Sequence, residues 1–172
     1  SNSRINWFVN LNKSIDVNIG NLFSSQPIIL HKQNLVISSQ SHLYILDSRN
    51  GSTLLKKAID SSVKPIVSGD YLFFITKKYL LICLNSKSSK IEYSININNS
   101  IAKFLNTKEK SVSVKNLKIV NDKLYLFLKN SFIVKFDTSG KIENIEKLKF
   151  KIQSEPIFLD GAILYLNNNN QL

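Results

Sequence analysis

A unit of about 40 residues recurs along this chain, and the recurrence limits the possible folds more than any other feature. Apolar runs that begin at Leu35, Leu72, Leu124 and Ile163 share one order of strands and polar turns. The intervals between these residues are 37, 52 and 39 positions, and the longest contains an insertion at residues 98–111. Repeats of this length that hold several short strands are typical of β-propeller blades.

Strands are favoured over helices in every repeat. Apolar residues alternate with a period of two, and polar turns recur roughly every 8 to 12 residues. A short strand led by Pro precedes three of the runs, at 26–30, 64–68 and 155–159, and 116–120 takes this place in the remaining repeat. Pro is tolerated at the start of a strand. Only residues 100–111 have the composition of a short helix or irregular loop.

These observations predict an all-β fold, a partial β-propeller of four-stranded antiparallel blades, in one domain over residues 1–172. A β-sandwich also has many short strands, but they do not recur as a four-strand cassette. The expected parts are an outer strand at 3–20, a blade at 24–60, a blade at 61–98 with the insertion 98–111, a blade at 112–150, and a half blade at 152–172.

An open ring is a consequence of this count. About three and a half blades do not close a propeller, and unpaired sheet edges favour pairing with another chain. We therefore expect the chain to be part of a longer protein and to associate with itself through its open edges.

A polar turn with a recurrent composition follows the third strand of each repeat. Asp47 and Gly51 belong to the first turn, Asn85 to the second, and Asp137 and Gly140 to the third, in which the Gly comes one residue earlier. An Asp or Asn side chain can accept hydrogen bonds from the turn backbone, and Gly permits a positive φ. Trp7 and Tyr93 are aromatic residues placed to bury a wide apolar area between blades.

Together these turns resemble the blade motif of the PQQ-like repeat β-propellers, which is roughly A-x-D-x-x-T-G-K-x-x-W. Leu55 stands where the motif has Trp, so one of the expected aromatic residues is missing. The resemblance implies a structural role for the matching residues. These residues are Trp7, Asp47, Gly51, Asn85, Tyr93, Asp137 and Gly140.

Two branches of this family differ in function. Quinoprotein dehydrogenases commonly carry a vicinal Cys pair and a calcium site of Glu, Asn and Asp, whereas this sequence has one Cys and no such cluster. The chain is more similar to the BamB-type outer-membrane assembly lipoproteins. That resemblance implies a non-catalytic protein scaffold without a cofactor, periplasmic or associated with the outer membrane. The alternative is a fragment of a quinoprotein-like enzyme whose cofactor site lies outside this chain.

No catalytic, cofactor-binding or metal-binding residues are predicted. His31 and His42 are the only histidines and have no Cys or carboxylate at ligand spacing. Glu143 and Glu146 are close in sequence but fit a solvated outer strand better than an acid–base pair. Cys83 lies in a buried-strand pattern and is predicted to be a core residue. Nucleophile-elbow, P-loop and dinucleotide-binding motifs are absent from the sequence.

The formal net charge of +11 raises the question of a nucleic-acid partner. The lysines are scattered, with no run of five or more, so we expect a solvated basic surface and no nucleic-acid binding. Aromatic residues interleaved with Lys could instead form a stacking platform for single strands. We assign them to the cores of the blades. They are Phe73, Phe74, Tyr79, Tyr125, Phe127, Phe132 and Phe136.

Overall fold

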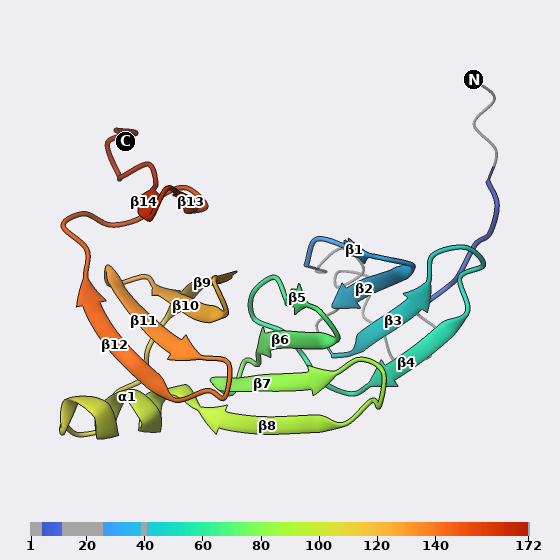
Figure 1. Ribbon diagram of the computed structural model, residues 1–172, viewed down its shortest axis with the longest axis horizontal. Coiled ribbons are helices and arrows are strands. Elements are labelled where there is room, and N and C mark those ends of the chain that lie inside the picture. The colour runs from blue at the N-terminus through green and yellow to red at the C-terminus, as the bar shows by residue number, and fades with distance from the viewer. Residues whose placement is uncertain (1–4, 12–25, 39–40, 172) are drawn as a thin grey trace.

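The protein forms three four-stranded antiparallel sheets followed by a two-stranded hairpin (Figure 1). A computed structural model describes residues 5–11, 26–38 and 41–171. The first sheet contains β1 (Ile29–His31), β2 (Asn34–Ser38), β3 (Leu43–Asp47) and β4 (Thr53–Lys57). The second contains β5 (Ile66–Ser68), β6 (Tyr71–Ile75), β7 (Leu80–Asn85) and β8 (Ile91–Asn96). The third contains β9 (Val114–Val120), β10 (Lys123–Leu128), β11 (Phe132–Asp137) and β12 (Ile142–Lys147), and the hairpin contains β13 (Ile157–Leu159) and β14 (Ala162–Leu164).

The sheets stand side by side along an open arc, so the predicted partial β-propeller is confirmed (Figure 1). In each four-stranded sheet the strands pair in chain order, and every pair is antiparallel. The first strands, β1, β5 and β9, lie on the inner side of the arc, and the fourth strands lie on its outer side (Figure 1). The two ends of the arc do not meet.

Alternating side chains build the cores between the sheets. In β6, Leu72 and Phe74 point toward the first sheet, whereas Phe73 and Ile75 point toward the third. Both faces of this strand are therefore apolar, which explains its uninterrupted hydrophobic sequence. A third core lies between the hairpin and the face of the third sheet that points away from the second sheet. In this core Phe158 packs against Phe127 with ring centroids 6.2 Å apart.

Most of the aromatic residues that were predicted to lie in the cores of the blades do so. Phe73, Phe74, Phe127 and Phe136 are fully buried between sheets. Phe132 is partly buried against the core between the second and third sheets, and Tyr125 against the hairpin. Tyr79 departs from the prediction, because it lies in the turn between β6 and β7 with φ of 60° and belongs to none of the three cores. The other rings are enclosed and do not form an exposed platform.

The insertion contains one helix, α1 (Ile97–Leu105), which follows β8 directly. The side chain of Asn96 caps its first turn by accepting a hydrogen bond from the Asn99 amide at 3.1 Å, which is a favoured capping arrangement. Asn106 ends it in the left-handed conformation, with φ of 51°. The helix therefore begins and ends earlier than the predicted segment 100–111.

Residues 5–11 lie against the first sheet but form no strand of their own. The Tyr44 hydroxyl donates to the Leu11 carbonyl at 3.3 Å. The rest of the outer strand expected at 3–20 lies mostly outside the described residues, and its strand character stays a prediction. Among the described residues, no helix has the length and apolar character of a membrane span.

Candidate functional site

The polar turns share a geometry built around one side-chain oxygen. Oδ1 of Asp47 accepts from the Arg49 amide at 2.8 Å, and Oδ1 of Asn85 accepts from the Lys87 amide at 3.0 Å. Oδ1 of Asp137 accepts from the Ser139 amide at 2.9 Å. These bonds close the turn between the third and fourth strands, as turn-forming Asx residues commonly do.

Ionic contacts strengthen the first of these turns. The Arg49 guanidinium donates two hydrogen bonds to the Asp47 carboxylate, at 3.0 and 2.6 Å. These hydrogen bonds from Arg49 hold the pKa of Asp47 at about 2, below its ordinary value of 3.8. The turn is therefore anchored by a carboxylate that remains ionised over most of the acidic range.

Aromatic residues pack onto the glycines of two turns. The Trp7 indole donates to the Ser48 carbonyl at 3.0 Å, and a Cβ added at Gly51 would lie 2.5 Å from the Trp7 ring. Trp7 therefore docks on a turn within this chain. Gly51 has φ of 72°, so both its backbone conformation and the nearby ring require a residue without a side chain.

Tyr93 occupies the corresponding place between the second and third sheets. A Cβ added at Gly140 would lie 3.0 Å from Cε2 of Tyr93 and 2.1 Å from Cδ1 of Ile95. The Tyr93 hydroxyl is buried and has no hydrogen-bond partner among the described residues. Burial raises the pKa of this phenol above its ordinary value. The structural importance of all seven motif residues stays a prediction.

Two corresponding grooves open between neighbouring sheets. The first groove, between the first and second sheets, encloses about 410 Å³. The second groove, between the second and third sheets, encloses about 440 Å³. In each groove, the later of the two sheets contributes two turns to the lining. One joins its first two strands, and the other joins its last two strands. These turns fall at matching places because each sheet repeats the same register.

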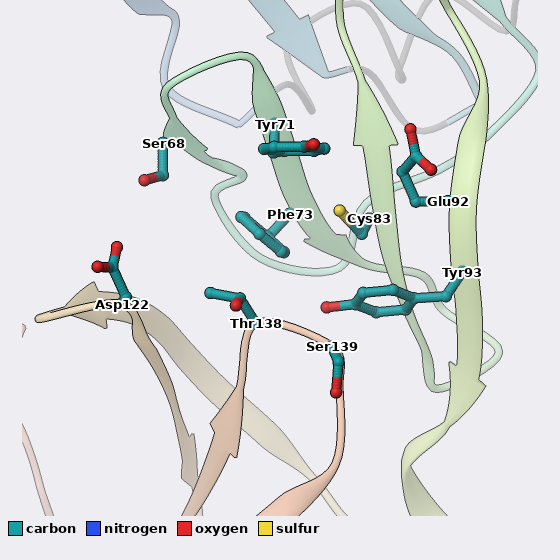
Figure 2. Close-up of a pocket in the computed structure, with 9 residues that line it drawn as sticks. All are labelled: Ser68, Tyr71, Phe73, Cys83, Glu92, Tyr93, Asp122, Thr138 and Ser139. Atoms are coloured by element: carbon teal, nitrogen blue, oxygen red, sulfur yellow. The ribbon is translucent and has the colours of Figure 1, made fainter.

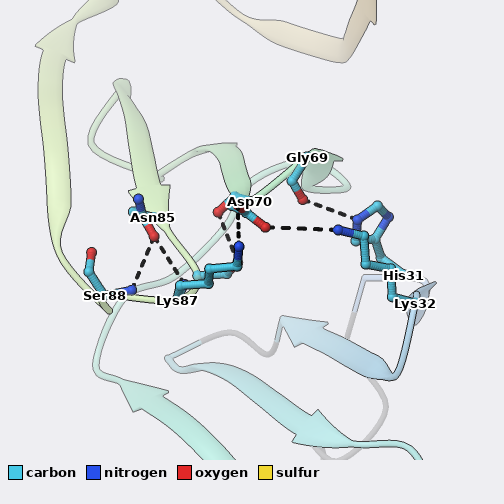
Figure 3. A network of polar contacts seen from close by, with 8 residues as sticks. His31, Lys32, Gly69, Asp70, Asn85, Lys87 and Ser88 are labelled. Atoms are coloured by element: carbon cyan, nitrogen blue, oxygen red, sulfur yellow. Dashed lines mark hydrogen bonds and ion pairs between the residues drawn. The ribbon is translucent and has the colours of Figure 1, made fainter.

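Ion pairs line the first groove and link its two sheets (Figure 3). The Asp70 carboxylate lies 2.8 Å from Nζ of Lys87 and 3.9 Å from Nζ of Lys32. The hydrogen bond from Lys87 is the main cause that lowers the pKa of Asp70. His31 Nε2 lies 3.1 Å from the Gly69 carbonyl, so this histidine joins two sheets.

The second groove has a different lining, with carboxyl, hydroxyl and aromatic groups but no lysine (Figure 2). Tyr71, Phe73 and Glu92 contribute from the second sheet, and Asp122 and Thr138 from the third. In Figure 2 the Tyr93 hydroxyl points toward Thr138. Neither Glu92 nor Asp122 forms an ion pair with any described residue.

Cys83 also lines the second groove, but its thiol is not poised for chemistry. The side chain is buried, and burial raises the pKa of the thiol to about 11. A thiol with such a pKa holds little thiolate near neutral pH. The predicted core position of Cys83 is therefore confirmed.

The remaining polar candidates lie apart from both grooves. Glu143 forms an ion pair with Lys123 and lies 3.4 Å from Nζ of Lys135. Glu146 is exposed on the same strand and contacts Asn144. In the described part of the chain, no three His, Cys, Asp or Glu side chains come together as a metal site would require.

Sequence reasoning missed the charged residues that line the grooves, namely Lys32, Asp70, Lys87, Glu92 and Asp122. The available signal was their position in the turns that flank each sheet. Read singly, such residues resemble a solvated surface; only the stacking of the sheets brings them together.

No protein-family model matches the sequence, and no curated protein matches it. Solved structures are similar in fold. BamB from Moraxella catarrhalis has a TM-score of 0.66 at 10% identity, covering 84% of this chain and 40% of BamB. The computationally designed Ika4 protein has a TM-score of 0.66 at 8% identity, covering 98% of this chain and 95% of Ika4. A quinohemoprotein alcohol dehydrogenase, ADHIIG from Pseudomonas putida HK5, has a TM-score of 0.52 at 14% identity, covering 67% of this chain and 19% of the enzyme.

The chain thus spans less than half the length of BamB. At these identities the similarity establishes the fold and assigns neither a reaction nor a partner. The fold is shared by BamB and by a dehydrogenase, and it confirms, at the level of structure, the resemblance to the PQQ-like β-propellers.

Proposed function

We propose that this chain acts as a non-catalytic protein-interaction scaffold, with its main contact surface at the β13–β14 hairpin. The observation that carries this proposal is the open apolar face of the hairpin. Phe158 points inward to the third sheet, whereas Ile157 and Leu159 point away from it and are 65% and 57% exposed. Large apolar side chains exposed together on a sheet face mark interaction surfaces.

The backbone of the hairpin supports the same role. β14 pairs with β13 alone, so its other edge carries unpaired amide and carbonyl groups among the described residues. Such an edge can accept a further strand, as in β-augmentation. A partner strand laid along β14 would satisfy these groups while its side chains lie beside those of Ala162 and Leu164, on the face that also carries Ile157 and Leu159.

A second copy of this chain is one partner that fits. At the other end of the arc, Leu30 of β1 points away from the core and is 65% exposed. Within the arc, each sheet packs such a face against the face of its neighbour, so the two open ends are suited to each other. Head-to-tail pairing of two copies would close a ring.

The likeness to BamB supports a role in outer-membrane β-barrel protein assembly, in the periplasm or at the outer membrane. In this proposal the hairpin contacts a component of the assembly complex. The basic surface, with its net charge of +11, favours an acidic patch on that partner.

Site-specific photocrosslinking in cells that naturally contain the protein tests the proposal. A photoreactive amino acid replaces Ile157, and the matched control places it at Thr53, an exposed position on β4 away from the hairpin. Crosslinks to an outer-membrane assembly protein at 157 but not at 53 are expected. The same crosslinked species at both positions, or none at 157, would contradict the proposal.

Self-association is tested separately on the purified chain by sedimentation equilibrium. A dimer is expected, and Ile157→Glu should dissociate it because a charge would be buried against an apolar face. Thr53→Glu is the matched control and should leave the dimer intact. A monomer at every concentration would exclude pairing between copies without affecting the crosslinking test.

A further inference from the structure

The turn between β3 and β4 contains Asn50 and Gly51, which form the only Asn-Gly pair in the sequence. Asn is one of the chemically labile residues of proteins, and a following Gly has no Cβ to hinder the approach of its nitrogen to the Asn side chain. In the other two turns, Ser88 and Ser139 stand immediately before the residue with positive φ. Of the three turns, the first alone therefore carries a side-chain amide at this position, and Asn50 is exposed to water.

This pair of residues can undergo deamidation without any added catalyst. Hydroxide removes the proton from the Gly51 amide, the nitrogen then bonds to Cγ of Asn50, and the Cγ–Nδ2 bond breaks to release ammonia. Water opens the resulting five-membered imide at either carbonyl and gives aspartate or isoaspartate at position 50. The reaction consumes one water molecule, releases one ammonia molecule and needs no oxidant or reductant.

In the folded turn, both reacting groups are held by hydrogen bonds. The Gly51 amide donates to the Asp47 carbonyl at 2.8 Å. Oδ1 of Asn50 accepts from the Ser52 amide at 2.9 Å. The first bond must break before the Gly51 nitrogen can lose its proton, and the second must break before the Asn50 side chain can turn toward that nitrogen. The closed turn therefore opposes the reaction.

Trp7 and Val9 hold the turn in this closed form. A Cβ added at Gly51 would lie 2.5 Å from Cε3 of Trp7 and 2.8 Å from Cγ2 of Val9, so both side chains lie directly on the Gly51 backbone. The Trp7 indole also donates to the Ser48 carbonyl in the same turn, at 3.0 Å. The backbone at Gly51 thus has no room to rotate while residues 5–11 are docked on the first sheet.

We propose that Asn50 is a deamidation site whose rate is controlled by the docking of Trp7 on the turn. While Trp7 is docked, the turn stays closed and the reaction is slow. When residues 5–11 leave the first sheet, the Gly51 amide is released and the imide forms. This proposal is independent of the scaffold role.

The product would prevent the turn from closing again. Isoaspartate adds a methylene group to the backbone between residue 50 and Gly51, so the Gly51 amide is displaced from the Asp47 carbonyl and from the Trp7 ring. Both products also add a negative charge near the Asp47 carboxylate, and like charges repel. A transient loss of docking would thereby become a permanent one, which gives the chain an irreversible record of undocking.

Peptide mapping by mass spectrometry, after incubation of the purified chain in mildly alkaline buffer, tests the proposal. Deamidation at residue 50 is expected to be slow in the native chain and fast in the urea-unfolded chain. Trp7→Ala should accelerate it about tenfold under native conditions, because the open fraction of the turn rises as docking is lost. Asn50→Ser is the matched control, since it places the residue of the other two turns here, and it should give no product at this position.

Amide hydrogen exchange measures the opening of the turn independently. In Trp7→Ala, exchange at the Gly51 amide should accelerate by the same factor as deamidation, whereas the amides of β6 stay protected because the chain remains folded. Trp7→Phe keeps a ring over Gly51 but loses the bond to Ser48, and it should accelerate both processes to a smaller extent. Faster exchange without faster deamidation, or equal deamidation rates in the native and unfolded chains, would overturn the proposal.

Fluorescence tests the fate of the product. Trp7 is the only tryptophan of the chain, so its emission reports the docking of this one residue. As deamidation proceeds, the emission should move to longer wavelength in proportion to the isoaspartate that chromatography detects. Asn50→Ser incubated for the same time should keep its original emission. An unchanged emission in fully deamidated chain would refute the loss of docking.

Discussion

Replacing Gly140 by Ala should destabilise the protein more than the same change at Gly69, because only Gly140 lies against a neighbouring sheet. Both residues have positive φ, 87° and 59°. A Cβ at Gly140 would lie 2.1 Å from Cδ1 of Ile95 and 3.0 Å from Cε2 of Tyr93, whereas nothing lies within 4 Å of a Cβ at Gly69. The two variants therefore share the backbone strain and differ in the contact.

The magnitudes follow from these two terms. A left-handed conformation costs a residue with a Cβ about 1–2 kcal/mol, which applies to both variants. Overpacking at Gly140 adds about 1–3 kcal/mol as Ile95 and the Tyr93 ring shift aside. The expected losses in the free energy of unfolding are thus about 2–5 kcal/mol for Gly140→Ala and about 1–2 kcal/mol for Gly69→Ala.

Urea unfolding followed by far-ultraviolet circular dichroism measures both losses. Because the two variants carry the same substitution, their difference reports the contact between sheets. Equal destabilisation of the two variants would show that the turn glycine is needed only for its backbone conformation and that aromatic docking on Gly140 adds nothing to stability.

Three further predictions concern the repeated turns. Tyr93→Trp should stabilise the chain by about 1 kcal/mol in urea unfolding, because an indole N–H can donate to the Thr138 carbonyl as Trp7 does to that of Ser48; no gain over Tyr93→Phe would argue against this hydrogen bond. Ser89→Gly should raise the thermal midpoint, since Ser89 holds φ of 58° where the motif has Gly, and relief of this strain is worth about 0.5–1 kcal/mol. The lowered pKa of Asp47 contributes stability that is full above about pH 4 and is lost as the pH falls toward 2. Asp47→Asn should therefore flatten this part of an acid-unfolding curve, and an unchanged slope would contradict the assigned pKa.

Much of the fold could be predicted from the sequence because its signals are local. In β6 the run from Tyr71 to Ile75 has apolar residues on both faces, which indicates a strand buried between two layers. The order of strands followed from the repeat. The start of α1 was placed too late, because Asn96 ends β8 and caps the helix at once, and a sequence pattern does not reveal that one residue serves both elements.

The candidate site was less predictable because it depends on how the sheets stack. The motif placed Tyr93 at an inter-sheet position, yet the missing partner of its hydroxyl depends on the direction of the ring. Lys32 and Asp70 lie 38 positions apart and meet only across two sheets. Asp122 looked like an ordinary turn residue, and its place at the second groove follows only from the stacking of the sheets.

The arrangement of the sheets has a consequence for how the chain opens and closes. Each sheet contacts only its immediate neighbours, so the free energy of folding is close to a sum over sheets and over the interfaces between them. Among the described residues, the second sheet alone has a four-stranded sheet on both sides. Amide hydrogen exchange should therefore be slowest in β6 and β7 and faster toward both ends of the arc. The molecule would then behave as a short linear array that frays from its ends and is held together by its middle.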